Sequence, residues 1–377
     1  MLKTFLKTVG YPLIAIMLAL AVYVHLTLQS LRLKTADGSS VRAVAEELVD
    51  RQLIPGISYA LIEKGVITSV ATIGVADMET GEPATDETLY EAASLTKPVI
   101  AEIARRLHED GVFDLNERIS DSLLNDRVKD PTLWQQLTPR HLLSHTSGFP
   151  NWSGDSRNAD RSDPLTFSFE PGSEFKYSGE GYVILLEFLE IKSGRTANQL
   201  AEALFAELDM EHSTLTGHHF DGHFARGHWR VTGRREARKT SIPVAAYSLF
   251  TNAEDYAKFL RYVMTAHAGT SSHAPFFQPH IDVAQFESGE ALAWSLGWGL
   301  LQADARDIYF QWGDNGAFRA LAAFDPVSQN GIVYFVNGSF GTIYADELAA
   351  PVLGNFDTAT SWFSNETKEI IRLWVQF

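Results

Sequence analysis

The spacing of hydrophobic residues changes along the chain and predicts regions of different secondary structure. Apolar residues recur with a helical period over Val41–Leu53, which predicts a helix. Ile57–Ile62 and Val66–Val75 are rich in β-branched residues and flank a short polar turn, so they predict a pair of strands. Helical patterns joined by polar connections then dominate from about residue 100 to about residue 264.

Strand-like runs return near the end of the chain, over Ile308–Trp312, Phe318–Phe324 and Gly331–Asn337. Strands at both ends of a helical middle predict an α+β fold, in which one antiparallel sheet is flanked by helices. The middle would form an inserted helical subdomain at about residues 100–265. A last amphipathic pattern covers Thr367–Phe377.

An apolar run, Tyr11–Leu28, precedes all of these elements. As a helix it would be about 27 Å long, close to the thickness of a hydrocarbon core. Two lysines lie before it, which favours a cytoplasmic N-terminus with the rest of the chain exported. We therefore expect a membrane anchor and linker at residues 1–35 and one main domain at residues 36–377, periplasmic or extracellular. A signal peptide cleaved near Ala19–Ala21 is the alternative.

The composition excludes several classes of function. A formal net charge of −16 argues against nucleic-acid binding, because a surface that binds phosphates needs to be basic. The chain has no cysteine, which excludes disulfides, thiol catalysis and thiolate metal sites. A content of 45% hydrophobic residues in a chain of 377 is ample for a core. The composition indicates no particular oligomeric state.

Ser94 and Lys97 lie at the start of an apolar helical pattern. Residues three apart share one face of a helix, so the lysine amine can reach the serine oxygen. A serine hydroxyl becomes a good nucleophile when a neighbouring base takes its proton, so the pair predicts acyl transfer through a serine ester. Ordinary polarity at a helix N-terminus is the alternative. A second pair at the same spacing, Ser173 and Lys176, follows a turn signal and lacks the helical context.

Two further segments carry candidate chemistry. Phe175–Tyr177 reads as a short aromatic strand that runs into glycines, and Tyr177 could project its hydroxyl into a cleft or pack in the core. Gln311–Phe318 ends one strand and begins another, and a glycine there lets backbone approach a ligand closely. Its N–H groups could stabilise an oxyanion, or the segment could be an ordinary hairpin turn.

The histidine-rich segments are interpreted as structural. His145 and Ser147 lie in a turn-rich stretch and are expected to make structural hydrogen bonds. Four histidines between His218 and His228 fit no helical ligand pair, so a solvated loop is preferred over a metal site. We expect neither a metal nor a cofactor. The basic stretch Arg226–Lys239 is expected to be solvated surface, with contact to anionic lipid or an acidic partner as the alternative.

Taken in order, these segments resemble the serine β-lactamase and penicillin-binding-protein superfamily. The resemblance lies in Leu89–Lys97, Leu137–Gly148 and Tyr177–Gly179, and it is strongest to the class C β-lactamase branch with its D,D-peptidase and esterase relatives. It implies a β-lactamase/transpeptidase-like fold. It also implies acylation of Ser94 followed by hydrolysis, with proton transfer shared by Lys97 and Tyr177.

The resemblance further implies an oxyanion hole formed by the N–H groups of Ser94 and Asp314. Each such donor typically contributes about 10²–10³ in rate. An ordinary lysine has a pKa near 10.4, so burial must lower the pKa of Lys97 by about 3 units for it to act as a base at neutral pH. A charged Lys97 could instead stabilise a tyrosinate at Tyr177 as the base, and the sequence leaves both mechanisms open.

The expected substrate-binding residues depart from the family pattern. Gln311, Trp312 and Gly313 stand where the third motif has lysine or histidine, any residue and glycine. Gly179 stands where the second motif has asparagine in many members. The first change removes a cation or imidazole that assists with a substrate carboxylate, and the second removes an amide. Asp314 completes the expected substrate-binding set.

The sequence therefore predicts a serine hydrolase whose small-molecule substrate is a β-lactam, a small ester or a D-amino-acid peptide. The loss of the cation at Gln311 weighs against efficient turnover of β-lactams. The alternative is a catalytically inactive, penicillin-binding-like sensor or binding protein that kept the fold. A third possibility is a helper domain that docks partners through its basic loop.

Overall fold

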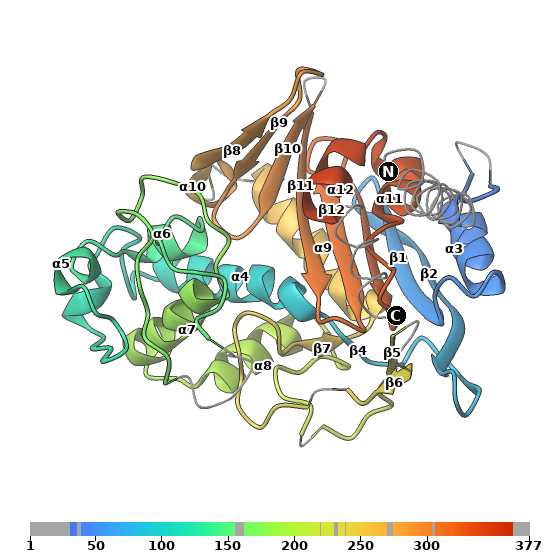
Figure 1. Cartoon of the computed structure of the whole chain (residues 1–377), viewed down its shortest axis with the longest axis horizontal. Helices are drawn as coiled ribbons and strands as arrows, with labels where there is room; N and C mark the ends of the chain where they lie inside the picture. Colours follow the sequence, from blue (N-terminus) through green and yellow to red (C-terminus); the bar gives the residue numbers. More distant parts are fainter. Residues whose placement is uncertain are drawn as a thin grey trace, which may run out of the picture.

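In the part of the chain that the structure describes, the strands form one large antiparallel sheet and two small ones. The computed structural model describes residues 31–35, 39–154, 162–218, 220–229, 233–237, 239–269, 274–303 and 306–364. The large sheet has nine strands in the order β3-β2-β1-β13-β12-β11-β10-β9-β8 (Figure 1). Its strands are β1 (Gly56–Glu63), β2 (Val66–Asp77), β3 (Glu82–Pro83), β8 (Ile281–Gln285), β9 (Ala291–Trp294), β10 (Gly299–Ala303), β11 (Arg306–Asp314), β12 (Arg319–Asp325) and β13 (Asn330–Val336). The small sheets pair β4 (Tyr90–Glu91) with β7 (Phe250–Thr251) and β5 (Gly227–Trp229) with β6 (Gly233–Arg235).

The early and late strands join in the middle of the large sheet. β1 pairs antiparallel with β13, so that Ile57 lies opposite Val336 and Ile62 opposite Gly331. This pairing confirms the α+β prediction of one antiparallel sheet built from both ends of the chain. The hydrophobic pattern missed β8, β9 and β10, which have only four or five residues each and so offer little periodicity to detect.

Helices cover both faces of this sheet. In Figure 1, α3 and α11 lie at one face of the sheet, α9 lies behind it, and α4 runs between the sheet and the group α5–α8. The helices are α3 (Val41–Asp50), α4 (Thr96–Glu109), α5 (Pro131–Trp134), α6 (Pro139–Leu143), α7 (Gly179–Ser193), α8 (Ala197–Glu207), α9 (Ala253–Gly269), α10 (Ala274–Phe277), α11 (Ala345–Leu353) and α12 (Asp357–Ser364). Short 3₁₀ turns cover Ala93–Leu95 and Ile119–Asp121. Helix α9 packs on β1 and β13, although the expected helical subdomain included most of it.

The two faces of the sheet build two separate cores. Along β13, Val333 and Phe335 point into the core that contains α4, α7 and α9, whereas Ile332 and Tyr334 point into the core beneath α3 and α11. Successive strand residues face opposite sides, so a strand buried on both faces is apolar without interruption. This explains why the last strands read as continuous hydrophobic runs.

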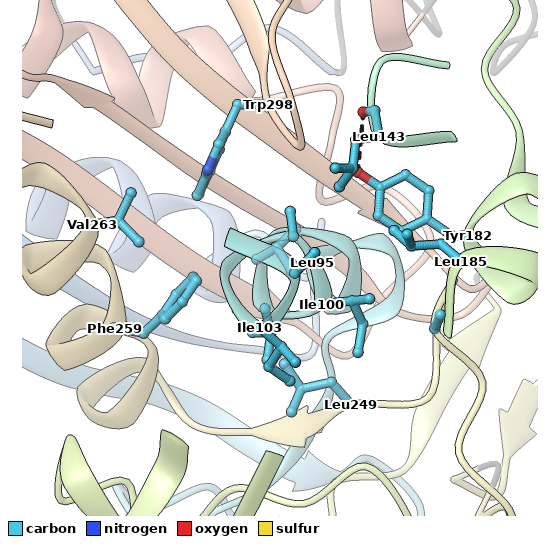
Figure 2. Close-up of a cluster of buried hydrophobic side chains, with 14 of the residues drawn as sticks. Leu95, Ile100, Ile103, Leu143, Tyr182, Leu185, Leu249, Phe259, Val263 and Trp298 are labelled. Atoms are coloured by element: carbon cyan, nitrogen blue, oxygen red, sulfur yellow. Dashed lines mark hydrogen bonds between the residues drawn. The ribbon is translucent and has the colours of Figure 1, made fainter. Parts of the chain in front are cut away.

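Helix α4 is buried on nearly every side. Figure 2 shows Ile100 and Ile103 of this helix between Leu185 of α7 and Phe259 of α9. Buried side chains continue from Thr96 to Arg105 without a break. The helix is therefore held by packing on several sides, and this packing fixes the position of its N-terminal end.

The structure bears on three predictions about segments of the chain. The prediction of a membrane-anchored protein, with its periplasmic or extracellular location, is corrected: among the residues that the structure describes, no helix is both long and apolar enough to cross a bilayer. Tyr11–Leu28, on which that prediction rested, and Thr367–Phe377 lie outside the described residues. Phe175–Tyr177 is not a strand, because its backbone bonds to a neighbouring loop: Lys176 N donates to the His145 carbonyl.

Candidate active site

Ser94 lies in the 3₁₀ turn that leads into α4, and its hydroxyl meets the Lys97 amine. Lys97 Nζ donates to Ser94 Oγ at 3.1 Å and to the Ala246 carbonyl at 2.9 Å. Ser94 is half-buried, whereas the Lys97 side chain is only 1% exposed. Ala93, immediately before the serine, has a φ of +50°, a left-handed conformation that is costly for a residue with a side chain. The backbone strain lies at Ala93, and the turn places the serine beside the amine.

The surroundings of Lys97 oppose its positive charge. Burial lowers the pKa of Lys97 from 10.5 to about 7, because the charged form loses its hydration inside the protein. A pKa near 7 leaves about half of the amines neutral at neutral pH, against well under about 0.1% for an ordinary lysine. The amine can therefore accept a proton under physiological conditions.

Tyr177 joins this pair from the loop before α7. Lys97 Nζ lies 4.8 Å from the centre of the Tyr177 ring, and the phenol interacts with the Ser94 hydroxyl. Burial raises the pKa of Tyr177, while hydrogen bonding with Ser94 and Gln311 acts in the opposite direction. The structure thus places Ser94, Lys97 and Tyr177 together, although the tyrosine lies far from the other two in sequence.

Gln311 supports Tyr177 in a defined orientation. Its Nε2 donates to the Tyr177 hydroxyl at 2.9 Å and to the Trp312 carbonyl at 2.8 Å. A carbonyl can only accept, so the nitrogen of the amide, and not its oxygen, must face Trp312 and Tyr177. The phenol oxygen therefore accepts a hydrogen bond from Gln311, and the phenol can donate its own hydrogen to a different group. Both hydrogens of Nε2 are used by these two bonds.

His145 positions Tyr177, although no local pattern in the sequence places the two residues together. The backbone N–H of Ser178 donates to His145 Nδ1 at 3.0 Å, and the imidazole lies 4.3 Å from the Tyr177 ring, centre to centre. Burial, followed by the nearby charge of Lys97, holds the pKa of His145 well below its usual value. The ring is therefore a neutral support for the tyrosine, which agrees with its interpretation as a structural hydrogen-bonder.

Strand β11 approaches the Ser94 turn at its far end. β10 pairs with β11 only as far as Phe310, whereas β12 continues to pair up to Asp314. Asn315 N donates to the Phe318 carbonyl at 3.1 Å, and hydrogen-bonded and non-hydrogen-bonded pairs alternate along an antiparallel ladder. The Asp314 N–H therefore points away from β12, and this end of β11 contacts the Ser94 turn.

A glycine makes this approach possible. A Cβ atom on Gly313 would lie 2.6 Å from the Ala92 carbonyl oxygen, closer than real Cβ atoms come to such an atom. The loop after β11 is also tied to the segment before Ser94, because Asn315 Nδ2 donates to the buried Glu91 carboxylate at 2.6 Å. No local pattern in the sequence indicates this bond. It fixes the distance between the two backbone segments.

The other expected substrate-binding residues lie around this centre. The Asp314 carboxylate accepts from Arg319 Nη1 at 2.6 Å, so its backbone rather than its side chain faces the Ser94 turn. Trp312 lies 5.1 Å from Tyr177 and stacks on Phe363 of α12 at 5.2 Å, both distances between ring centres. Gly179 begins α7, and its N–H donates to Asn151 Oδ1 at 2.9 Å.

The remaining candidates from the sequence lie elsewhere. Ser173 Oγ donates to the Glu170 carbonyl and Lys176 Nζ to Ser168 Oγ, so the second serine–lysine pair is not joined. His228 Nε2 accepts from the Met78 N–H at 3.2 Å. Within the described part of the chain, no group of three or more His, Cys, Asp or Glu residues could hold a metal ion.

Comparison with known proteins shows the family of the chain. The profile of the Beta-lactamase family matches residues 41–352, which is most of the chain. The chain belongs to the Beta-lactamase family. The matched range contains Ser94, Lys97, Tyr177 and the end of β11.

Curated relatives are longer than this chain. A penicillin-binding protein of Bacillus subtilis (strain 168) is 31% identical over 169 residues, which are 41% of this chain and 36% of the relative. Protein flp of Staphylococcus aureus (strain MW2) is 23% identical over 326 residues, 81% of this chain and 64% of the relative. The chain therefore spans less than two thirds of the length of these relatives.

Solved structures confirm the β-lactamase/transpeptidase-like fold. The octameric penicillin-binding protein homologue from Pyrococcus abyssi has a TM-score of 0.67 at 21% identity and covers 83% of this chain and 77% of its own. D-alanine carboxypeptidase AmpC from Burkholderia cenocepacia has a TM-score of 0.64 at 20% identity, over 79% of this chain and 93% of its own.

Replacing Lys97 with methionine should stabilise the protein. The pKa of Lys97 is lowered to about 7 in the fold and returns to about 10.5 on unfolding, so between these values the unfolded state binds the extra proton. Wild-type stability therefore falls as the pH falls from 10.5 to 7, by up to about 1.4 kcal/mol per pH unit, and this dependence ends below 7. As the pH falls from 10.5 to 7, the free energy of unfolding of Lys97→Met should increasingly exceed that of the wild type. Below pH 7 this difference should stay constant.

Urea unfolding at a series of pH values measures this difference. Lys176→Met is the matched control, because Lys176 lies at the surface and its amine bonds to Ser168 Oγ. The control measures what the loss of a surface lysine by itself does to stability. A constant difference between wild type and Lys97→Met from pH 6 to pH 10 would contradict the lowered pKa.

Proposed function

We propose that this chain is a serine hydrolase that forms an acyl-enzyme on Ser94 and releases the acyl group to water. The observation that carries this proposal is the buried amine of Lys97, whose Nζ lies 3.1 Å from Ser94 Oγ and whose pKa is lowered to about 7. A serine hydroxyl next to a base that is partly neutral at pH 7 is an activated nucleophile. Membership of the Beta-lactamase family supports the same chemistry.

In the proposed acylation step, Lys97 Nζ removes the proton from Ser94 Oγ as this oxygen attacks the substrate carbonyl. The new Oγ–C bond places a negative charge on the carbonyl oxygen. The N–H groups of Ser94 and Asp314, which lie on the two facing segments, would stabilise that charge. The bond to the leaving group then breaks, and the leaving group takes up a proton.

Tyr177 is proposed to carry that proton. Its oxygen accepts from Gln311, so its own hydrogen remains available for the Ser94 oxygen or the leaving group. The proton that Lys97 took from Ser94 can then replace the one that the phenol gave up, since Lys97 Nζ lies 4.8 Å from the centre of the Tyr177 ring. In deacylation a water molecule attacks the ester carbon, the Oγ–C bond breaks, and the proton from water returns to Ser94.

Of the two candidate bases, the directions of the pKa shifts favour Lys97. Burial lowers the pKa of the lysine towards neutrality and raises the pKa of the tyrosine away from it. A tyrosinate would therefore be rare at pH 7, whereas a neutral amine is common. Because the two groups lie close together, their titrations are coupled, and the pair rather than one residue sets the pH dependence.

The surroundings of Gln311 favour a neutral substrate, such as a small ester, over a β-lactam. Both Nε2 hydrogens are donated inside the protein, so this amide has none left for a substrate carboxylate. A D-amino-acid peptide remains a candidate, since one similar structure is named a D-alanine carboxypeptidase. The neutral third motif is also the observation that favours the second candidate function, an inactive sensor or binding protein.

Ser94→Ala should abolish both turnover and covalent labelling. The wild type should hydrolyse a short-chain para-nitrophenyl ester faster than nitrocefin and should be labelled by a fluorophosphonate at Ser94, because only the activated hydroxyl forms the ester. Ser173→Ala is the matched control and should behave as wild type. Equal hydrolysis by wild type and Ser94→Ala would contradict the assignment, and a wild type without labelling would support the inactive alternative.

Gln311→Met should lower kcat/KM for the neutral ester by up to about tenfold, because it removes the hydrogen bond to the Tyr177 oxygen while keeping the size of the side chain. The loss should appear in kcat, since the bond acts on the tyrosine rather than on the ester. Gln311→Lys should improve turnover of nitrocefin, which carries a carboxylate, relative to the neutral ester. Unchanged kinetics in Gln311→Met would show that this bond has no part in catalysis.

A further inference from the structure

An aromatic ring fills the space that a side chain at position 179 would need. A Cβ atom on Gly179 would lie 2.9 Å from both Cζ2 and Cη2 of Trp152. Real Cβ atoms essentially never approach other atoms so closely. The glycine therefore leaves room for the tryptophan ring. The ring occupies the space of a side chain at position 179, two residues after Tyr177.

Hydrogen bonds hold Trp152 in this place from both sides. On one side, the Asn151 carbonyl accepts from the N–H groups of Gly179 and Glu180, each at 3.1 Å, and Asn151 Oδ1 accepts from Gly179 at 2.9 Å. On the other side, the buried Glu180 carboxylate accepts from the backbone and hydroxyl of Ser153, at 3.1 and 2.7 Å. The tryptophan is thus fixed against the N-terminus of α7.

Trp152 also contacts the segment that holds the catalytic amine. Its ring packs edge-on against Tyr247 with the ring centres 5.7 Å apart. Tyr247 directly follows Ala246, whose carbonyl accepts from Lys97 Nζ at 2.9 Å. Tyr247 is 9% exposed, whereas Trp152 is only partly buried. The two rings form an aromatic wall that links the Tyr177–Gly179 segment to Ala246, whose carbonyl accepts from Lys97. Trp152 is the more exposed ring of this wall.

We propose that Trp152, supported by Tyr247, determines the acyl-group preference of the enzyme and selects esters with a bulky apolar or aromatic acyl group. This inference rests on the proposed function of Ser94. Covering an exposed ring with an apolar group removes both surfaces from water, and paired rings gain further stabilisation. The backbone N–H groups of Gly179 and Glu180 beside the ring are already donated to Asn151, so they are not left over for a polar acyl group.

The test compares two para-nitrophenyl esters, the phenylacetate and the acetate, in wild type, Trp152→Ala and Trp152→Phe. The ratio of kcat/KM for phenylacetate to that for acetate should fall about tenfold in Trp152→Ala. The ratio should remain within about threefold of wild type in Trp152→Phe, which keeps a ring. Trp134→Phe is the control for loss of an indole, because Trp134 packs in the core within α5. It should leave the ratio unchanged.

Three outcomes separate the inference from the proposed function. Equal losses on both esters in Trp152→Ala, in a protein that is still labelled at Ser94, would overturn the inference and leave the hydrolase proposal intact. A higher phenylacetate-to-acetate ratio in Trp152→Ala would overturn it as well, because the ring would then restrict the acyl group rather than bind it. Hydrolysis that does not depend on Ser94 would overturn the proposed function and the inference together.

Discussion

The removal of one lysine amine from water, next to one serine hydroxyl, is the constraint on which the site depends. Lowering the pKa of Lys97 from 10.5 to about 7 corresponds to about 5 kcal/mol of unfavourable burial at neutral pH. Such a cost is a large part of the stability of a typical domain, so the packing around the helix must offset it. Helix α4 and the turn before it supply that packing, since Leu95 of the turn and Ile100 and Ile103 of the helix all lie in the core (Figure 2). The most buried helix of the site is thus also the one that carries the proposed base.

The large sheet determines what faces this helix. β1 and β13 join the two ends of the chain, and β11 continues beyond the end of β10 to reach the Ser94 turn. Gly313 allows the close approach, and the bond between Asn315 and Glu91 maintains it. A tyrosine from a third segment completes the group, held by His145 on one side and Gln311 on the other. The site exists only where three distant parts of the chain meet, which makes it a property of the whole fold.

The sequence predicted the parts that depend on local spacing. Ser94 and Lys97 follow from a separation of three residues on a helix, and the buried strands follow from continuous apolar runs. Tyr177 required the family resemblance, because no local rule links it to the serine. His145 and Trp152 act through loop packing against α7, which hydrophobic periodicity does not encode. Phe175–Tyr177 was wrongly expected to be a strand, since its aromatic residues pack around the site rather than along a sheet.

The pH dependence of Ser94 acylation tests the central claim most directly. The rate constant for labelling by a neutral fluorophosphonate can be measured between pH 5 and pH 10 with Ser94→Ala as the blank. If the buried amine of Lys97 is the base, the rate constant should rise about tenfold per pH unit at low pH and become constant above a midpoint near 7. A rate constant that continues to rise to pH 10, as for an amine with an ordinary pKa, would contradict the account.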